Sequence, residues 1–154
     1  MPELRKDIVI GRWVIISSER MCRPDQFSEV KEMDKEENNN FCPFCPGNED
    51  KTPPEIFSIR NDNSLPNTAG WEVRVVPNKY PALRIEGELK RKGVGMFDMM
   101  NGIGAHEVII ETPQHNLQIQ DFSIEHFSKV INTYKYRSLD LKNDTRLRYI
   151  MIFK

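Results

Sequence analysis

Apolar and polar residues alternate along several short stretches of the chain, which is the pattern of strands with one buried face. The clearest alternation runs over residues 71–76 and stops before a proline. Residues 55–60 and 104–112 show similar patterns, and an apolar run over residues 146–154 predicts a last, mostly buried strand. The chain is therefore expected to form a sheet from strands that lie far apart in the sequence.

Three further stretches are shorter. Residues 8–10 and 13–16 are apolar runs separated by Gly11-Arg12, which predicts a tight hairpin with that pair at its turn. Residues 82–86 predict a short strand. For the methionine-rich residues 96–100 we expect a short turn packed in the core, because methionine fills irregular gaps.

One long helix is expected late in the chain. Ser123 is suited to cap its first turn, where Glu125 would complement the helix dipole. The apolar residues that follow fall largely on one helical face: Phe127, Val130, Ile131, Tyr134 and Leu141. The fold class is predicted as α+β, an antiparallel sheet with one long C-terminal helix.

Length and composition indicate one globular domain over residues 1–154. Hydrophobic residues make up 38% of the chain and charged residues 29%, with a formal net charge of −1. That balance does not favour nucleic-acid binding, and no apolar run approaches the roughly 20 residues that span a bilayer. The N-terminus also lacks an apolar signal core, so we place the protein in the cytoplasm. Residues 28–40 are polar and charged, which predicts a mobile loop.

The sequence from Phe41 to Glu49 carries the strongest chemical signal. Cys42 and Cys45 are three positions apart, each followed by a proline, and a glycine closes the turn. This arrangement predicts a chelate for a thiol-binding ion such as zinc, because no helical pattern follows as it would in a redox-active dithiol. The third cysteine, Cys22, is interpreted as an ordinary thiol.

Zinc requires about four ligands, so the histidines are candidates for the remaining positions. His106 lies within an expected strand, where a structural role is the simpler interpretation, and His126 lies in the first turn of the expected helix. His115 follows a strand-ending proline, where a short loop could direct its ring toward the cysteines. Spacing alone leaves the choice open, with a slight preference for His115.

Five blocks of sequence occur in an order that resembles the N-terminal domain of galactose-1-phosphate uridylyltransferase, a branch of the histidine-triad superfamily. They are Gly11 to Ile16, Arg20-x-x-Arg23-Pro24, Cys42 to Glu49, Val75 to Leu83 and Gly104 to His115. The resemblance implies half of a histidine-triad-like transferase fold that binds UDP-glucose and a hexose 1-phosphate in galactose metabolism. It also implies a structural zinc held by Cys42, Cys45 and His115. The nucleotide contacts that it implies are Phe44 against the base, Arg20 and Arg23 on the phosphates, and Asn78 with Lys79 on the ribose or base.

The family's catalytic step depends on a His-Pro-His motif, which would follow the last expected strand. Its first histidine is the fourth zinc ligand, and its second attacks the α-phosphorus to form a uridylyl-histidine. The sequence reaches Lys154 without any His-x-His. We therefore expect the domain to be incomplete at its C-terminal end and this chain alone to lack a catalytic residue. The expected partner is a second copy of the chain, in a homodimer, or a missing C-terminal half.

Two alternatives remain at this point. A relative of the ADP-sugar phosphorylases would have a similar cysteine turn with a different base pocket, and the sequence does not distinguish uracil from adenine. The other alternative is a non-catalytic zinc module that binds a partner.

Overall fold

The computed structural model describes residues 2–17, 42–61 and 63–154. These residues form two compact units. The first comprises residues 2–17, 80–106 and 137–154, and the second comprises residues 42–61, 63–79 and 107–136. The loop expected at residues 28–40 lies outside the described residues.

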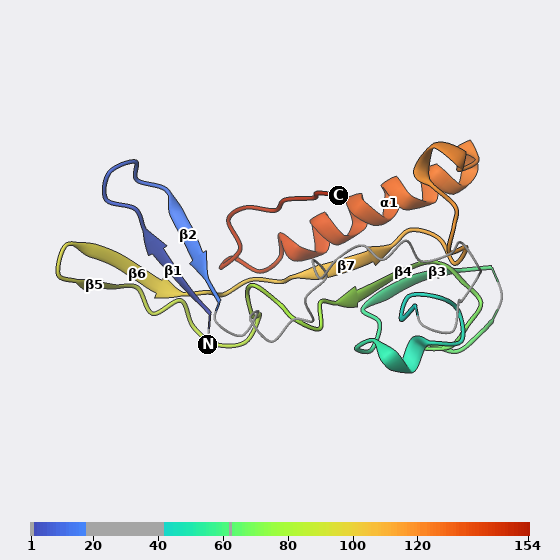
Figure 1. Ribbon diagram of the computed structural model, residues 1–154, viewed down its shortest axis with the longest axis horizontal. Coiled ribbons are helices and arrows are strands. Elements are labelled where there is room, and N and C mark those ends of the chain that lie inside the picture. The colour runs from blue at the N-terminus through green and yellow to red at the C-terminus, as the bar shows by residue number, and fades with distance from the viewer. Residues whose placement is uncertain (1, 18–41, 62) are drawn as a thin grey trace, which may run out of the picture. The chain divides into compact units, whose positions relative to one another are not determined.

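The second unit contains a three-stranded antiparallel sheet in the order β3-β4-β7 (Figure 1). Its strands are β3 (Phe57–Arg60), β4 (Trp71–Pro77) and β7 (Glu107–Ile110), so all three regions predicted from alternation contain a strand. β7 is shorter than predicted, because residues 104–106 and 111–112 lie outside it. The central strand, β4, is the most deeply buried of the three.

The predicted helix is present as α1 (Ile124–Leu141), and most of it belongs to the second unit. The backbone N–H of His126 donates to the Ser123 hydroxyl at 3.1 Å, which confirms the expected N-cap. Val130 is fully buried, whereas Phe127 and Ile131 are exposed, so the buried face of α1 is narrower than the sequence pattern predicts.

The sheet of the second unit has two differently covered faces. The Tyr136 ring of α1 stacks on Phe57 at a centroid distance of 4.5 Å, and Phe57 lies opposite Val75 in the ladder. Paired residues in neighbouring strands share a face, so α1 covers the face that carries Val75. A small apolar cluster lies elsewhere on the sheet and consists of Trp71, Val76 and Ile110 with Val108 packed against them.

The first unit contains a four-stranded antiparallel sheet in the order β2-β1-β6-β5. Its strands are β1 (Glu3–Lys6), β2 (Trp13–Ile16), β5 (Lys92–Val94) and β6 (Phe97–Asn101). The expectation of a core turn at residues 96–100 is wrong, because this stretch forms most of an inner strand paired with both β1 and β5. Apolar and polar residues do not alternate strictly in its Asp-Met-Met sequence. The stretch is a strand because the backbone of β1 pairs with it.

The N-terminal hairpin exists, but with a different turn from the one predicted. Residues 8–10 are not a strand; they lie in the loop between β1 and β2, which spans residues 7–12. The Asp7 carboxylate accepts hydrogen bonds from the backbone of Val9 at 2.9 Å and Ile10 at 3.3 Å. These bonds lower the pKa of Asp7 and stabilise a turn despite the apolar sequence. Gly11 has a φ of +72°, a conformation that favours glycine.

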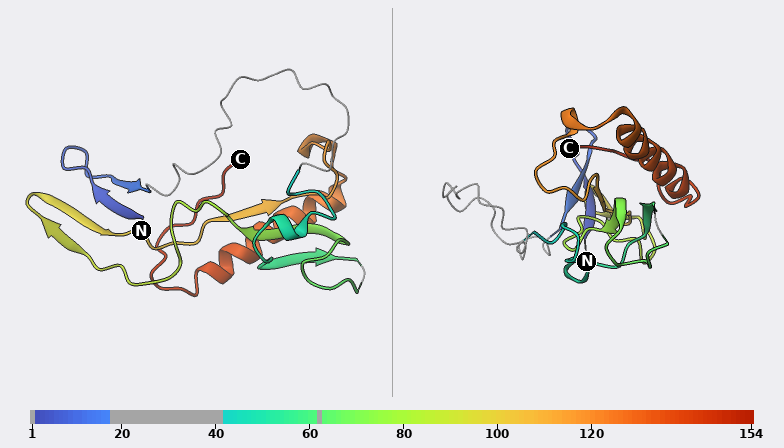
Figure 2. Two further views of the ribbon diagram at one scale, coloured as in Figure 1. Left: turned by 60° about the horizontal axis from the view of Figure 1, so that its bottom comes forward. Right: turned by 90° about the vertical axis from the view of Figure 1, so that its right-hand side faces the viewer.

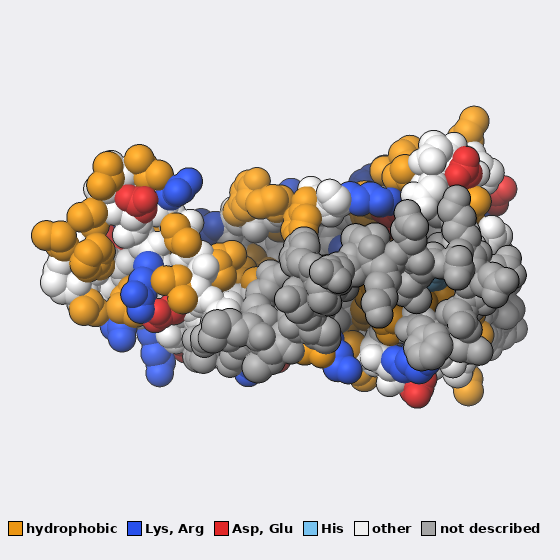
Figure 3. Space-filling model, in the orientation of Figure 1, with side chains coloured by type: hydrophobic (Ala, Val, Ile, Leu, Met, Phe, Trp, Pro, Cys, Tyr) orange, Lys and Arg blue, Asp and Glu red, His pale blue; other side chains and the backbone are white. Residues whose placement is uncertain are grey.

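Much apolar surface of the first unit is exposed. Figure 2 shows the β1–β2 and β5–β6 hairpins side by side, and Figure 3 shows hydrophobic side chains gathered over them. All four residues of β2 are exposed. Ile8, Val9 and Ile10 are exposed at one hairpin tip, and Met96 and Phe97 at the other.

Two other strand predictions are wrong. Within residues 82–86, only Arg84 forms an isolated bridge, to Ile103. Residues 146–154 adopt no strand, and Tyr149, Met151 and Phe153 are exposed. An apolar run forms a strand only when another strand's backbone lies beside it, and no described strand does so here. No helix among the described residues is long and apolar enough to cross a bilayer.

Candidate metal centre and its surroundings

The cysteine turn is held by its own backbone and by one amide side chain. The Cys45 N–H donates to the Cys42 carbonyl at 3.3 Å, and Asn48 Nδ2 donates to the same carbonyl at 2.7 Å. Gly47 has a φ of +90°, a conformation that residues with a side chain rarely adopt. The glycine that closes the turn is therefore explained by its backbone conformation. The turn brings the two thiols close together.

A buried carboxylate also supports this turn, although no role could be predicted for it from the sequence. Glu49 Oε1 accepts a hydrogen bond from Trp71 Nε1 at 2.8 Å, and its Oε2 accepts one from the Gly47 N–H at 2.9 Å. Glu49 thus connects the cysteine turn to the first residue of β4. An acidic residue directly after the turn was visible in the sequence, but its tryptophan partner lies 22 residues away.

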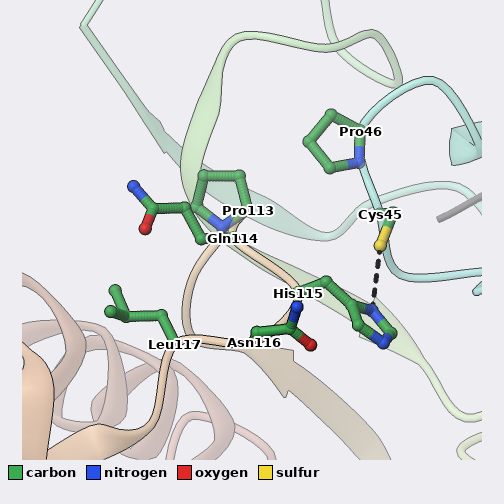
Figure 4. Close-up of a pocket in the computed structure, with 7 residues that line it drawn as sticks. All are labelled: Cys45, Pro46, Pro113, Gln114, His115, Asn116 and Leu117. Atoms are coloured by element: carbon green, nitrogen blue, oxygen red, sulfur yellow. Dashed lines mark hydrogen bonds between the residues drawn. The ribbon is translucent and has the colours of Figure 1, made fainter. Parts of the chain in front are cut away.

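The structure brings His115 to the two cysteines. Pro113 ends the segment after β7, and His115 Nδ1 lies 3.2 Å from Cys45 Sγ (Figure 4). The Cys42 and Cys45 sulfurs and a His115 ring nitrogen all lie within 4.8 Å of one another. An open hollow of about 590 Å³ adjoins them and is lined by Cys45, Pro46, Pro113, Gln114, His115, Asn116 and Leu117.

This arrangement could hold a metal ion. Two thiolates and an imidazole are a donor set that zinc prefers, and such ligands lie about 3.5–3.8 Å apart around a tetrahedral ion. Both cysteines are free thiols. Burial raises the pKa of the Cys45 thiol, and the neighbouring Cys42 raises it further. A divalent cation would reverse that effect, because it binds the thiolate form.

The other two histidines have different surroundings. His106 Nδ1 accepts a hydrogen bond from the Ala82 N–H at 2.9 Å in the first unit; contrary to expectation, His106 lies just before β7 rather than inside a strand. His126 Nε2 donates to the Glu111 carbonyl at 2.8 Å. Among the described residues, neither histidine joins the cysteine cluster.

The proposed nucleotide contacts do not all gather at the cysteine turn. Phe44, at the tip of the turn, is exposed, with 41% of its surface accessible. Asn78 and Lys79 follow the end of β4 that pairs with the start of β7, whereas His115 lies beyond the other end of β7. Arg20 and Arg23 lie outside the described residues.

A buried group of charges lies in the same unit. Glu55 Oε2 accepts a hydrogen bond from Arg74 Nε at 2.9 Å, and both Glu55 oxygens accept from Arg60 Nη2. The side chains of Arg74 and Glu55 are 1% and 5% exposed. Arg74 Nη1 also donates to the Thr52 hydroxyl, whereas its buried Nη2 has no hydrogen-bond partner among the described residues. This group could not be recognised from the sequence, because Arg74 occupies an ordinary position in an alternating strand.

The geometry can be compared with known proteins. The whole chain, residues 1–154, matches the family described as galactose-1-phosphate uridyl transferase, N-terminal domain. The chain belongs to this family. The resemblance to this branch of the histidine-triad superfamily is thereby confirmed.

Curated relatives of this family member differ in activity. ADP-glucose phosphorylase from Arabidopsis thaliana is 35% identical over 99% of this chain. Galactose-1-phosphate uridylyltransferases from Thermotoga maritima and Schizosaccharomyces pombe are 25% and 29% identical, over 100% and 92% of the chain. The chain spans only 43%, 41% and 40% of the lengths of these three proteins.

Solved structures confirm the α+β fold of this part of the family. A crystal structure of an ADP-glucose phosphorylase from A. thaliana with bound ADP-glucose matches with a TM-score of 0.57 and 33% identity, covering 97% of this chain and 41% of that one. A GalT-like protein from the same plant matches with a TM-score of 0.56 and 29% identity, over 95% of this chain and 38% of that one.

Proposed function

We propose that this chain is the nucleotide-sugar-binding part of a nucleotidyl-transfer enzyme, and that its substrate class is an ADP-sugar. The observation that carries the choice of base is the 35% identity with ADP-glucose phosphorylase over 99% of the chain, against 25% and 29% with the two uridylyltransferases. UDP-glucose with a hexose 1-phosphate is therefore the second candidate, although the resemblance of the sequence blocks first suggested it.

In this proposal, the residues of the chain bind and orient the substrate. Phe44 packs against the base, Arg20 and Arg23 neutralise the phosphates, and Asn78 with Lys79 contacts the ribose or base. Cys42, Cys45 and His115 would hold a structural zinc, which fixes the turn that carries Phe44. Because Asn78 and His115 lie beyond opposite ends of β7, an extended ligand would lie along this strand rather than in one compact pocket.

The attacking group would come from outside these residues. Nucleotidyl transfer through a covalent intermediate requires a nucleophile aligned with the α-phosphorus. His115 Nδ1 faces Cys45 Sγ, and His126 Nε2 is bonded to a backbone carbonyl. The sequence contains three histidines and no His-x-His. A C-terminal half that carries a His-x-His motif would supply the missing histidine and complete the site.

The test is a comparison of ADP-glucose and UDP-glucose by isothermal titration calorimetry on the zinc-loaded chain. We expect ADP-glucose to bind at least about tenfold more tightly, a difference of roughly 1.4 kcal/mol. Equal affinities, or a preference for UDP-glucose, would favour the uridylyltransferase alternative. If neither ligand bound at millimolar concentration, the non-catalytic zinc module would be the better description.

Replacement of Phe44 with alanine is expected to weaken binding of the preferred nucleotide sugar. A base stacked on an aromatic ring contributes about 1–3 kcal/mol, so the dissociation constant should rise roughly 5- to 150-fold. Phe97→Ala is the matched control, because Phe97 is similarly exposed at 48% but lies in the first unit. An unchanged affinity in Phe44→Ala would remove Phe44 from the base site.

A further inference from the structure

Glu111, which directly follows β7, attaches the segment that carries His115 to α1. Two bonds make the attachment. The Glu111 carbonyl accepts the hydrogen bond from His126 Nε2 at 2.8 Å, and Glu111 Oε1 accepts one from the Tyr134 hydroxyl. Backbone and side chain of the same residue are therefore both held by the helix.

The helix is well suited to hold Glu111 at two points. His126 and Tyr134 are eight residues apart, about two helical turns, so their side chains project from the same face. The His126 ring is oriented by an edge-to-face contact with Phe122 at 4.8 Å. Its backbone is fixed by the Ser123 cap. Burial, followed by the bond to Glu111, raises the pKa of Tyr134 well above its usual range.

Only three residues separate Glu111 from His115, and they have little freedom. Pro113 has a fixed φ, and the Gln114 N–H donates to the Thr112 hydroxyl at 3.2 Å. A displacement of Glu111 would therefore be passed to the His115 ring, whose Nδ1 lies 3.2 Å from Cys45 Sγ. The cysteines have a separate support, since Glu49 ties their turn to Trp71.

We propose that Tyr134 and His126 are positioning residues for the metal-binding histidine. Through Glu111, they hold the His115 ring toward the cysteine sulfurs before the ion arrives. The proposal rests on the proposed metal site. In metal centres, partners outside the ligand set commonly change metal affinity by 10- to 100-fold, because they orient the ligands.

The first experiment measures zinc affinity by competition with a chromophoric chelator. Tyr134→Phe removes the hydroxyl and keeps the ring, and we expect roughly tenfold weaker zinc binding. Tyr136→Phe is the matched control, because Tyr136 lies on the same helix but packs on Phe57. Its affinity should equal that of the parent. Equal affinities in Tyr134→Phe and the parent would overturn the proposal.

A second measurement separates positioning from a general loss of stability. The effect of Tyr134→Phe on zinc affinity should disappear in a His115→Ala background, since the histidine is then no longer there to be positioned. The same tenfold loss in both backgrounds would contradict the proposal. With cobalt in place of zinc, Tyr134→Phe should alter the d–d absorption bands while the thiolate charge-transfer band remains.

His126 provides a second variant that does not depend on the folding of Tyr134→Phe. His126→Leu should weaken zinc binding, and His126→Gln should restore most of it, because the glutamine amide can donate near the position of Nε2. Weak binding by both variants would overturn the positioning role of His126. A parent chain that binds no zinc would overturn the metal site and this proposal together, and that result is visible before any variant is made.

Discussion

Replacing Cys42 with serine is expected to remove most of the bound zinc and to lower the free energy of unfolding by several kcal/mol. A serine hydroxyl is a poor zinc ligand at neutral pH, and the binding energy of a structural zinc contributes directly to folding. Elemental analysis of the purified proteins should give about one zinc per parent chain and far less in Cys42→Ser. Urea unfolding of the same samples measures the loss of stability.

Cys22→Ser is the matched control for this experiment, because it removes the one cysteine that no argument assigns to the metal. Its zinc content and unfolding free energy should match those of the parent. Equal zinc in Cys42→Ser and the parent would remove the metal assignment. It would also leave the 3.2 Å approach of Cys45 and His115 as an ordinary packing contact.

Replacing Glu55 with glutamine is expected to destabilise the second unit by about 3–5 kcal/mol, as removal of one partner of a buried ion pair does. Arg74 is almost completely buried, and within the part of the chain that the structure describes its Nη2 has no hydrogen-bond partner. Without the carboxylate, the guanidinium groups of Arg60 and Arg74 would both lose the negative charge that they share. Glu3→Gln is the matched control, because the Arg5–Glu3 pair is more exposed and should contribute no more than about 1 kcal/mol.

The effect of Glu55→Gln should depend on pH. Burial alone would raise the pKa of Glu55, but the hydrogen bonds from Arg60, Arg74 and Ser58 outweigh it and lower the pKa. A lowered pKa in the folded state means that the stabilisation is fully present above the unfolded value of about 4.3 and is lost as the pH falls through the folded value. The stability difference between parent and Glu55→Gln should therefore be constant near neutrality and shrink below about pH 4. A difference that stays constant to pH 2 would contradict this account.

The elements that could be predicted from sequence are those whose formation is determined by residues close together in the chain. β4 alternates strictly and stops at a proline, and α1 has a serine cap with Val130 at the centre of its buried face. The α+β class follows from these elements. The cysteine turn is likewise local, because spacing, prolines and Gly47 all act within a few residues.

The elements that were missed depend on distant partners or on side-chain bonds. β6 is a strand because β1 pairs with it, and these two strands are more than ninety residues apart in the sequence. Residues 8–10 have the composition of a strand, but the Asp7 carboxylate captures two backbone amides of the turn. The apolar run at residues 146–154 has no neighbouring strand among the described residues, so composition alone overestimates its burial.

The candidate site was predictable in part for the same reason. The convergence of His115 on the cysteines could be stated from the resemblance but not from spacing, which left His106 and His126 open. Glu49 and Tyr134, which support the two sides of the site, depend on partners 22 and 23 residues away. Such contacts are visible only once the chain is folded.

Cys45 and His115 are 70 positions apart in the sequence, and this separation gives the proposed ion a consequence beyond its local geometry. An ion held by both would close a large ring in the chain, and the entropy lost on closing such a ring rises only with the logarithm of its length. It would act as a disulfide does in a secreted protein, by restricting the unfolded ensemble. Unlike a disulfide, this cross-link would open and close with the supply of metal rather than with the redox state of its surroundings.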